Sequence, residues 1–244
     1  MPNFELISFP GPDALAAAAA AAWLDEIEAA RRAGKSHRVA LSGGRITQKF
    51  FLFTAEKALA RKISFSHVHF FWADERCVPP ADPESNFKLA DELLFIPLKI
   101  SEGQIHRLRG ELPPEEAVAH ANAEILRVAA HESGRPILDL IFLGMGEDGH
   151  VASLFQNARF DPEKNAKCNA PFFFVPNSPK PPPRRISLNY SAIAAAGQVW
   201  VLASGAGKED ALQKSLNAEG QTPLGRVMES RLSTKIFVDI PVRI

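Results

Sequence analysis

The sequence predicts an α/β protein with a doubly wound, mainly parallel sheet that carries helices on both faces. Short apolar runs alternate along the chain with longer segments in which apolar residues recur at helical spacing. The short runs are continuously apolar, which is typical of strands covered on both sides. With 244 residues, 46% of them hydrophobic, the chain can build a large core, and we expect one domain over residues 1–244.

The pattern divides the chain into strands and helices in regular alternation. We expect strands at residues 4–9, 38–42, 68–72, 138–143, 199–203 and 236–239. Helices are expected between them, at residues 13–33, 47–60, 86–95, 114–131 and 208–216. The alanine-rich run 14–24 follows Asp13, lacks a basic leader and falls short of the ~20 apolar residues that span a bilayer. We therefore interpret it as an ordinary helix with Gly34 at its C-terminal cap.

Composition narrows the possible partners. The 28 basic and 28 acidic residues cancel, so no overall charge favours nucleic acid or a membrane surface. The two cysteines, Cys77 and Cys168, are far apart and lack the spacing of a zinc cluster, which favours a reducing cytoplasm. His67 and His69 alternate along a strand, but no third ligand follows at a suitable spacing, so we predict no metal site.

Loops at the carboxyl ends of the strands are the expected ligand sites of such a sheet. The first, residues 42–45, joins a strand to a helix through Gly43 and Gly44 and ends at Arg45. It is either a phosphate-binding turn, with Arg45 adding charge, or merely a tight turn. The second, residues 73–76, carries Asp74, Glu75 and Arg76. Its arginine could clamp a phosphate, or the three charges could form a local ion-pair cluster.

The third loop, LGMGEDGHVASLF at residues 143–155, is the strongest candidate for an active site. We expect its glycines to leave backbone N–H groups free at a helix start, facing an anion or a developing oxyanion. Asp148, two residues before His150, could fix its tautomer and raise its basicity, making His150 a general base. Gly144, Gly146 and Gly149 match a dinucleotide-binding pattern, but the segment lies mid-chain and no long helix follows it, so we reject that interpretation.

A pair of arginines follows the prolines of residues 176–183. Arg184 and Arg185 could belong to a polyproline segment that binds a partner module, or could bring an arginine onto a strand that faces the site. The residues alone leave both possibilities open.

Five segments, taken in their order along the chain, resemble the 6-phosphogluconolactonases, relatives of the glucosamine-6-phosphate deaminases and ribose-5-phosphate isomerases. They are LSGG at 41–44, WADERCVP at 72–79 with Ser85-Asn86, the 143–155 segment, PPPRRIS at 181–187, and Gly207-Lys208 before a helix. The resemblance implies a Rossmann-like sheet of the deaminase/isomerase type. It also implies hydrolysis of the δ-lactone of 6-phosphogluconate in the oxidative pentose phosphate pathway, without metal, nucleotide or other cofactor.

The resemblance also assigns site residues. It places the base at His150 and its neighbouring acid at Asp148, and implies substrate-binding positions that include Gly43, Gly44, Arg76, Arg185 and Lys208. To these we add Arg45, Asp74 and Gly149 as substrate-binding candidates. The expected ligand is a small phosphorylated sugar lactone, and the expected protein is a cytoplasmic monomer or small homo-oligomer.

Departures from the family pattern and two rival functions qualify this assignment. Arg45-Ile46-Thr47 stands where many members read Ser-Thr-Pro, so the start of the helix is expected to be less fixed. Val151 replaces a common threonine and Gln156 a proline.

An amino-sugar-phosphate deaminase or isomerase would use Asp74 to move protons, but its relatives tend to read Ala-Phe-Asn where this chain has Ala152-Ser153-Leu154. A non-catalytic sugar-phosphate sensor would carry a DNA-binding helix pair, of which the sequence shows no sign.

Overall fold

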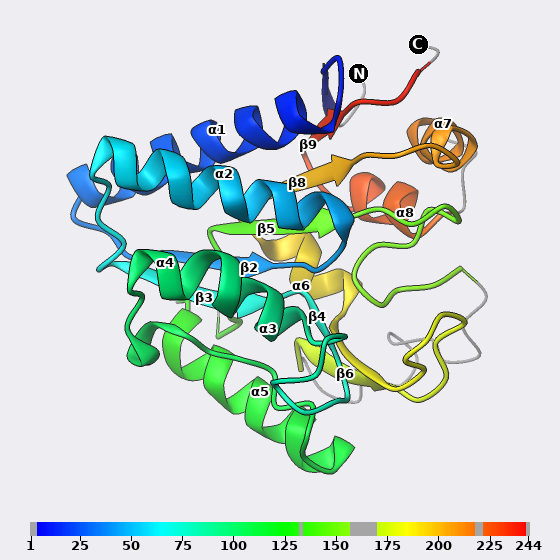
Figure 1. Ribbon diagram of the computed structural model, residues 1–244. Helices are drawn as coiled ribbons and strands as arrows, with labels where there is room; N and C mark the ends of the chain where they lie inside the picture. Colours follow the sequence, from blue (N-terminus) through cyan, green and yellow to red (C-terminus); the bar gives the residue numbers. More distant parts are fainter. Residues whose placement is uncertain (1–3, 132–133, 157–169, 218–221, 243–244) are drawn as a thin grey trace.

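A six-stranded parallel sheet forms the centre of the computed structural model, which describes residues 4–131, 134–156, 170–217 and 222–242 (Figure 1). The strand order is β1-β9-β8-β5-β2-β3, and every neighbouring pair is parallel. The strands are β1 (Phe4–Ser8), β2 (His37–Leu41), β3 (Val68–Trp72), β5 (Leu140–Gly144), β8 (Gln198–Ala203) and β9 (Thr234–Val238). All six lie within two residues of their predicted positions, which confirms the α/β class.

The predicted helices are also present, with shifted ends. They are α1 (Pro12–Arg32), α2 (Arg45–Arg61), α3 (Asn86–Ala90), α5 (Pro114–Ala129) and α7 (Glu209–Leu216). The helix expected at 86–95 changes after Ala90 into a π-helical turn, Asp91–Phe95, and continues into α4 (Ile96–Leu98). Gly34, at φ +66, follows the C-terminal cap of α1 as predicted. No helix in the described part of the chain is long and apolar enough to cross a membrane.

A second, three-stranded antiparallel sheet was not predicted. It consists of β4 (Asp74–Arg76), β7 (Arg185–Leu188) and β6 (Phe172–Val175), in the order β4-β7-β6. The prediction that residues 73–76 form only a loop is therefore wrong. These three residues are all charged, so nothing apolar marks them as a strand, and their pairing with β7 depends on residues more than 100 positions away. Two short helices, α6 (Tyr190–Ala195) and α8 (Pro223–Glu229), also escaped prediction.

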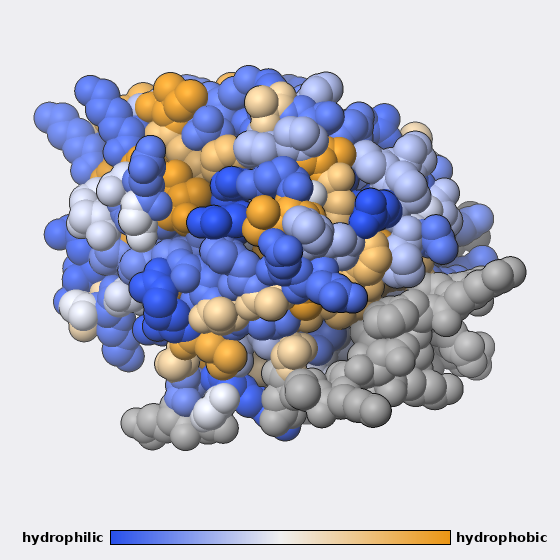
Figure 2. All heavy atoms as spheres, turned by 90° about the horizontal axis from the view of Figure 1, so that it is seen from below, coloured by the Kyte–Doolittle hydropathy of each residue, from blue (hydrophilic) through white to orange (hydrophobic). Residues whose placement is uncertain are grey.

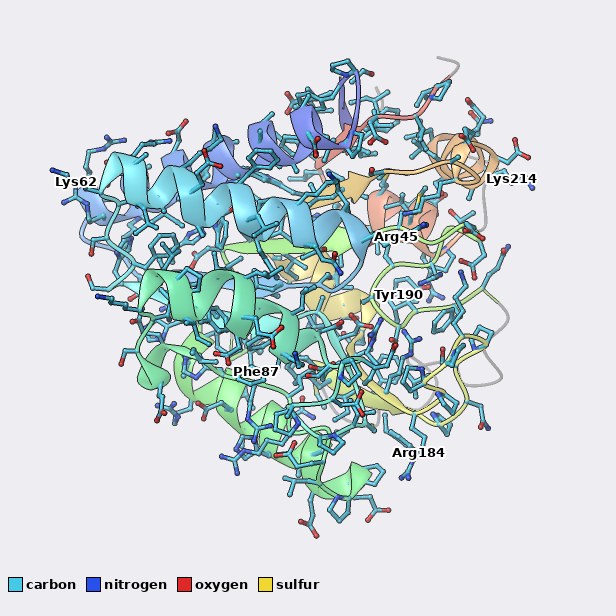
Figure 3. All side chains as sticks on the ribbon, in the orientation of Figure 1. Arg45, Lys62, Phe87, Arg184, Tyr190 and Lys214 are labelled. Atoms are coloured by element: carbon cyan, nitrogen blue, oxygen red, sulfur yellow. The ribbon has the colours of Figure 1, made fainter. Side chains whose placement is uncertain are left out.

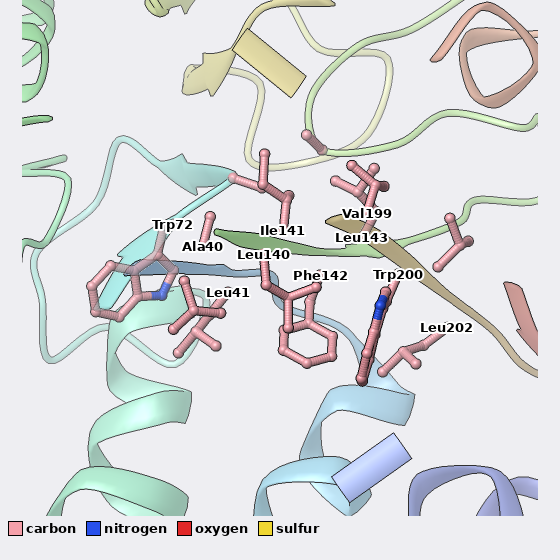
Figure 4. Packing of buried hydrophobic residues seen from close by; sticks show 14 of the residues in the cluster. Ala40, Leu41, Trp72, Leu140, Ile141, Phe142, Leu143, Val199, Trp200 and Leu202 are labelled. Carbon is pink, nitrogen blue, oxygen red and sulfur yellow. The ribbon is translucent and has the colours of Figure 1, made fainter. Parts of the chain in front are cut away.

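Aromatic side chains fill the core between the sheet and α1 and α2. Alternate residues of β5 and β8 point to opposite faces: Phe142 and Trp200 to one, Ile141 to the other (Figure 4). The Phe142 ring lies 4.6 Å from that of Phe50 on α2 and 5.2 Å from that of Trp23 on α1. This packing fixes α2, and hence its N-terminus, against the carboxyl ends of the strands.

The outer face shown in Figure 2 is mainly hydrophilic, with apolar residues in small groups. Small exposed groups of apolar residues of this kind are normal on a globular protein.

Replacing Phe142 with alanine tests the importance of this aromatic core. Because the side chain is almost fully buried among three aromatic neighbours, Phe142→Ala should lower the free energy of unfolding by about 3–5 kcal/mol. Urea titration followed by circular dichroism measures the loss. Leu232→Ala is the control, because Leu232 is 99% exposed and its removal should change stability by less than about 0.5 kcal/mol. Equal effects of the two substitutions would contradict this account of the core.

Candidate active site

A cavity of about 330 Å³ opens at the carboxyl edge of the parallel sheet. The loops that follow β2, β3, β5 and β8 all contribute to it, together with β7. It is lined by eight of the ten residues predicted from the sequence: Gly43, Gly44, Arg45, Asp74, Arg76, His150, Arg185 and Lys208. The other two, Asp148 and Gly149, lie behind His150 in the third loop, outside the lining.

His150 and Asp148 form a hydrogen-bonded pair at this cavity. His150 Nδ1 lies 2.5 Å from Asp148 Oδ1. Gly146 makes the pair possible, because a Cβ atom there would lie 2.0 Å from His150 Nδ1 and 2.7 Å from Asp148 Oδ1. The turn is closed by Gly146 N–H, which donates to His150 O, and by Gly149 N–H, which donates to Gly146 O. The third loop is therefore shaped around its acid–histidine pair.

Burial and charge set the protonation of this pair. Burial lowers the pKa of His150 below its ordinary value, and it outweighs the opposing attraction of Asp148. Burial alone would raise the pKa of Asp148, but the hydrogen bond and charge of His150 bring it below its ordinary value. A neutral imidazole beside a carboxylate holds its proton on Nδ1, which leaves the Nε2 lone pair available to accept a proton.

No helix begins after His150, in contrast to our expectation. Residues 145–156 form turns joined by the isolated bridges Met145↔Val151 and Val151↔Leu154. Gly149, at φ +77, and Ala152, at φ +48, adopt the left-handed conformation, which interrupts helical continuation. Other helices instead begin at the cavity: α2 starts at Arg45 and α3 at Asn86, and Lys208 is the N-cap residue of α7.

The first loop combines a close backbone approach with the start of α2. A Cβ atom on Gly43 would lie 1.9 Å from Asn86 Oδ1, so the glycine makes room for Asn86, which also lines the cavity. Gly44 adopts φ +115 before α2. Thr47 Oγ1 donates to Gly43 O at 3.0 Å, so the threonine fixes the turn that we expected to be loose without a proline. Sequence reasoning missed the role of Asn86 in the lining, although it lies in the quoted Ser85-Asn86 pair.

Asp74 and Arg185 are buried together on the small sheet. Arg185 Nη1 lies 3.8 Å from Asp74 Oδ2, with 5% and 7% of their side chains exposed. Ser153 Oγ lies between them: it donates to Asp74 Oδ2 at 2.6 Å and accepts from Arg185 Nη1 at 3.4 Å. Arg185 opens β7, which resolves the earlier alternative in favour of an arginine carried onto a strand that faces the site.

Arg76 combines the two roles that the sequence left open. Its Nη1 donates to Glu84 O at 2.6 Å and lies 3.6 Å from Glu84 Oε2. The same side chain lines the cavity, and its buried Nε has no hydrogen-bond partner. Arg76 is therefore both a member of a local ion pair and a cation that faces the cavity.

A separate group of cations lies where α2 and the loop after β8 meet. Lys208 lines the cavity, and burial is the main cause that lowers its pKa, followed by the positive charge of Arg45. Arg45 makes no ion pair within the described residues, and Figure 3 shows it at the N-terminal end of α2. Ser204 and Gly205 complete this side of the lining. The loop after β8 also lies at a carboxyl end of the sheet, where ligand sites are expected, although the sequence pointed to Lys208 only through the family resemblance.

The remaining titratable candidates are structural. Within the described ranges, no group of three or more histidine, cysteine or acidic residues could hold a metal ion. His67 Nε2 lies 3.0 Å from Ile27 O, and His69 Nδ1 lies 3.0 Å from His106 Nε2. Cys77 is a half-buried free thiol, and Cys168 lies outside the described residues.

Glu75 holds the two ends of the second loop together. Its Oε1 accepts from the N–H groups of Arg76 and Asn86, and its Oε2 accepts from Phe87 N–H and the Ser85 hydroxyl, at 2.7–3.0 Å. Burial nevertheless raises the pKa of Glu75 to about 7. Since the carboxylate faces backbone donors rather than the cavity, we assign it a structural role.

Comparison with known proteins agrees with the architecture. The profile of the family described as glucosamine-6-phosphate isomerases/6-phosphogluconolactonase matches residues 10–236. The 6-phosphogluconolactonase of Mycobacterium tuberculosis is 37% identical over 216 residues, which cover 85% of this chain and 84% of the relative. That of Treponema pallidum is 35% identical over 174 residues, covering 71% and 70% of the two chains.

Solved structures extend the similarity to nearly the whole chain. A crystal structure of a devB protein has a TM-score of 0.83 at 30% identity and covers 97% of this chain and 96% of its own. The 6-phosphogluconolactonase of Thermotoga maritima has a TM-score of 0.80 at 28% identity and covers 97% and 99%.

The structural role of Glu75 can be tested by Glu75→Gln, which replaces one accepting oxygen with an NH₂ group that faces N–H donors. We expect the free energy of unfolding to fall by about 1–3 kcal/mol, the cost of unmade buried hydrogen bonds. Glu56→Gln on the exposed face of α2 is the matched control and should change stability by less than about 0.5 kcal/mol. Chemical denaturation measures the free energy of unfolding of both variants. An unchanged value in Glu75→Gln would refute the structural role.

Proposed function

The chain belongs to the glucosamine-6-phosphate isomerase and 6-phosphogluconolactonase family, and from this premise we propose how His150 and the cavity around it act on the substrate. The enzyme hydrolyses 6-phospho-D-glucono-1,5-lactone to 6-phosphogluconate in the oxidative pentose phosphate pathway. One observation carries the proposed mechanism: a histidine, held by an aspartate, faces a cavity lined by five arginine and lysine residues, Arg45, Lys49, Arg76, Arg185 and Lys208.

In this mechanism, His150 activates a water molecule. Its Nε2 accepts a proton as the water oxygen adds to C1 of the lactone, and negative charge develops on the carbonyl oxygen. The intermediate then collapses, the bond between C1 and the ring oxygen breaks, and the imidazolium returns the proton to that oxygen. Asp148 keeps Nδ1 protonated throughout and stabilises the imidazolium. Since the lactone carbonyl is already electrophilic, no covalent intermediate is required.

Cations at the start of α2 hold the phosphate in our proposal. Backbone N–H groups at the N-terminus of this 17-residue helix favour an anion, and Arg45 and Lys208 add two positive charges beside it. Arg45 therefore adds a full charge where many family members have a serine. Arg76, Asp74 and Arg185 line the other part of the cavity, where they orient the sugar hydroxyls and the lactone.

The remaining departures lie away from the proposed chemistry. The Val151 side chain is fully buried and does not line the cavity, so the missing threonine hydroxyl removes no substrate contact. Gln156 is exposed and also lies outside the lining. We further propose a cytoplasmic protein that acts as a monomer or small homo-oligomer on a soluble sugar phosphate.

The test of the function is acid release from freshly generated 6-phosphogluconolactone, measured above the spontaneous background. We expect His150→Ala to lower kcat by about 10²–10⁴-fold, because it removes general-base catalysis. His67→Ala, on the N-terminal side of β3, should retain activity. Activity that persists in His150→Ala would exclude the base assignment. Release of ammonia from glucosamine 6-phosphate, or binding of 6-phosphogluconate without any lactone turnover, would instead favour the deaminase or the sensor.

The pH dependence of kcat/KM tests the protonation of His150. Since burial lowers the pKa of this residue below its ordinary value of 6.5, the catalytic neutral form persists below that pH. We expect kcat/KM to be constant above the His150 pKa and to fall as the pH drops through it, with a midpoint below pH 6.5.

Asp148→Asn removes an interaction that raises the pKa of His150, so the midpoint should move to still lower pH while the maximum rate decreases. A midpoint at or above 6.5 in the unmodified enzyme would contradict this assignment.

A further inference from the structure

Arg185 lines the active-site cavity but has few donors left for a ligand. Its Nε donates to Pro182 O at 3.0 Å, and its Nη2 donates to Lys180 O at 3.1 Å and to Pro181 O at 3.2 Å. Its Nη1 donates to Ser153 Oγ at 3.4 Å. A guanidinium group has five N–H bonds, so a single one remains. Arg185 cannot bind a phosphate through two parallel hydrogen bonds without giving up contacts within the protein.

The start of α2 offers cations that are less committed. Arg45 and Lys49 both line the cavity. They are one helical turn apart on α2, so their side chains project from the same face of the helix. Helices α1 and α2 lie side by side and begin at the same end of the sheet (Figure 1), and Pro12 at the start of α1 also lines the cavity. Lys49 therefore lies between the start of α2 and the start of α1, at the edge of the cavity.

The ammonium group of Lys49 has one hydrogen-bond partner within the described residues, and this partner is exposed. Lys49 Nζ lies 2.5 Å from Asp13 Oδ1, in the first turn of α1. The two side chains are 44% and 67% exposed. An ion pair so open to water contributes little to stability, because both charges are well solvated when they separate. Lys49 can therefore exchange Asp13 for a ligand at a small cost.

A phosphate group is a stronger partner than Asp13 for this ammonium group. A phosphate monoester carries about 1.5–2 negative charges at pH 7 and three strong acceptor oxygens, whereas a carboxylate carries one charge. In the cavity, the phosphate would also meet Arg45, Lys208 and the backbone N–H groups at the start of α2. The flexible four-carbon stem of a lysine allows its charge to move from one partner to the other while the helix stays in place.

We propose that Lys49 is a specificity-determining residue, whose ammonium group leaves Asp13 and binds the phosphate of the substrate together with Arg45 and Lys208. This inference rests on the proposed function, to which it adds a third cation for the phosphate. Asp13 is a positioning residue, because it holds the ammonium group at the edge of the cavity in the free enzyme. Since Lys49 contacts the phosphate and not C1, it contributes to binding of the substrate and of the transition state equally.

Lactones with and without a phosphate separate this role from a structural one. We expect Lys49→Met to raise KM for 6-phosphogluconolactone by about 10-fold with little change in kcat, the pattern of lost uniform binding. Turnover of unphosphorylated glucono-1,5-lactone should stay as in the unmodified enzyme, and Lys49→Arg should keep most of the affinity for the phosphorylated lactone. Lys57→Met is the matched control, because Lys57 lies about two turns further along α2 and does not line the cavity.

Binding of the product gives a readout that needs no turnover. Calorimetric titration with 6-phosphogluconate should give a Kd about 10-fold higher in Lys49→Met than in the unmodified enzyme. Asp13→Asn should bind the product at least as tightly as the unmodified enzyme, because Lys49 then leaves no carboxylate.

Three results would overturn the role of Lys49 and leave the lactonase function intact. They are an unchanged KM and Kd in Lys49→Met, an equal loss of activity of this variant on both lactones, and weaker product binding in Asp13→Asn. Absence of lactone turnover by the unmodified enzyme would instead overturn the proposed function. A raised Kd of Lys49→Met for 6-phosphogluconate would still support Lys49 as a phosphate-binding residue in that case, and an unchanged Kd would overturn both.

Discussion

The parallel direction of the six central strands is the constraint on which the site depends. Because the strands all end at one edge, the loops after β2, β3, β5 and β8 converge there, although the first and the last of them are more than 150 residues apart in sequence. The aromatic packing of Phe142 against α1 and α2 holds the N-terminus of α2 at the same edge. The regular arrangement of the parallel sheet therefore brings a helix start, several cations and one histidine together at one cavity.

The hydrogen-bond partners of the buried charged groups determine which of these groups can contact a substrate. Glu75 is enclosed by four donors, and Arg185 by three carbonyl oxygens and a serine hydroxyl, so both mainly organise the loops. Arg45 makes no ion pair within the described residues and lines the cavity, and we therefore propose it as a phosphate-binding group. The distinction between positioning and binding groups therefore follows from counting donors and acceptors, not from the type of residue.

The sheet was predictable from the sequence, whereas much of the detail at the site was not. Continuously apolar runs identify the six parallel strands because burial on both faces requires them. The charged strand β4 gives no such signal, since its partner β7 is distant in sequence. The sequence also indicates His150 and Asp148, but the positive φ values of Gly149 and Ala152 turn the chain where a helix was expected. The contacts of Arg185 with backbone carbonyls have no local pattern at all.

The proposed mechanism depends most directly on the neutral state and tautomer of His150. Nitrogen-15 NMR of histidine-labelled enzyme at pH 7, with the His150 signals assigned by comparison with His150→Ala, measures both. We expect a proton on Nδ1, in a hydrogen bond to Asp148, and an unprotonated Nε2. A proton on Nε2, in either the neutral or the charged ring, would contradict the proposal that this nitrogen takes the proton from water.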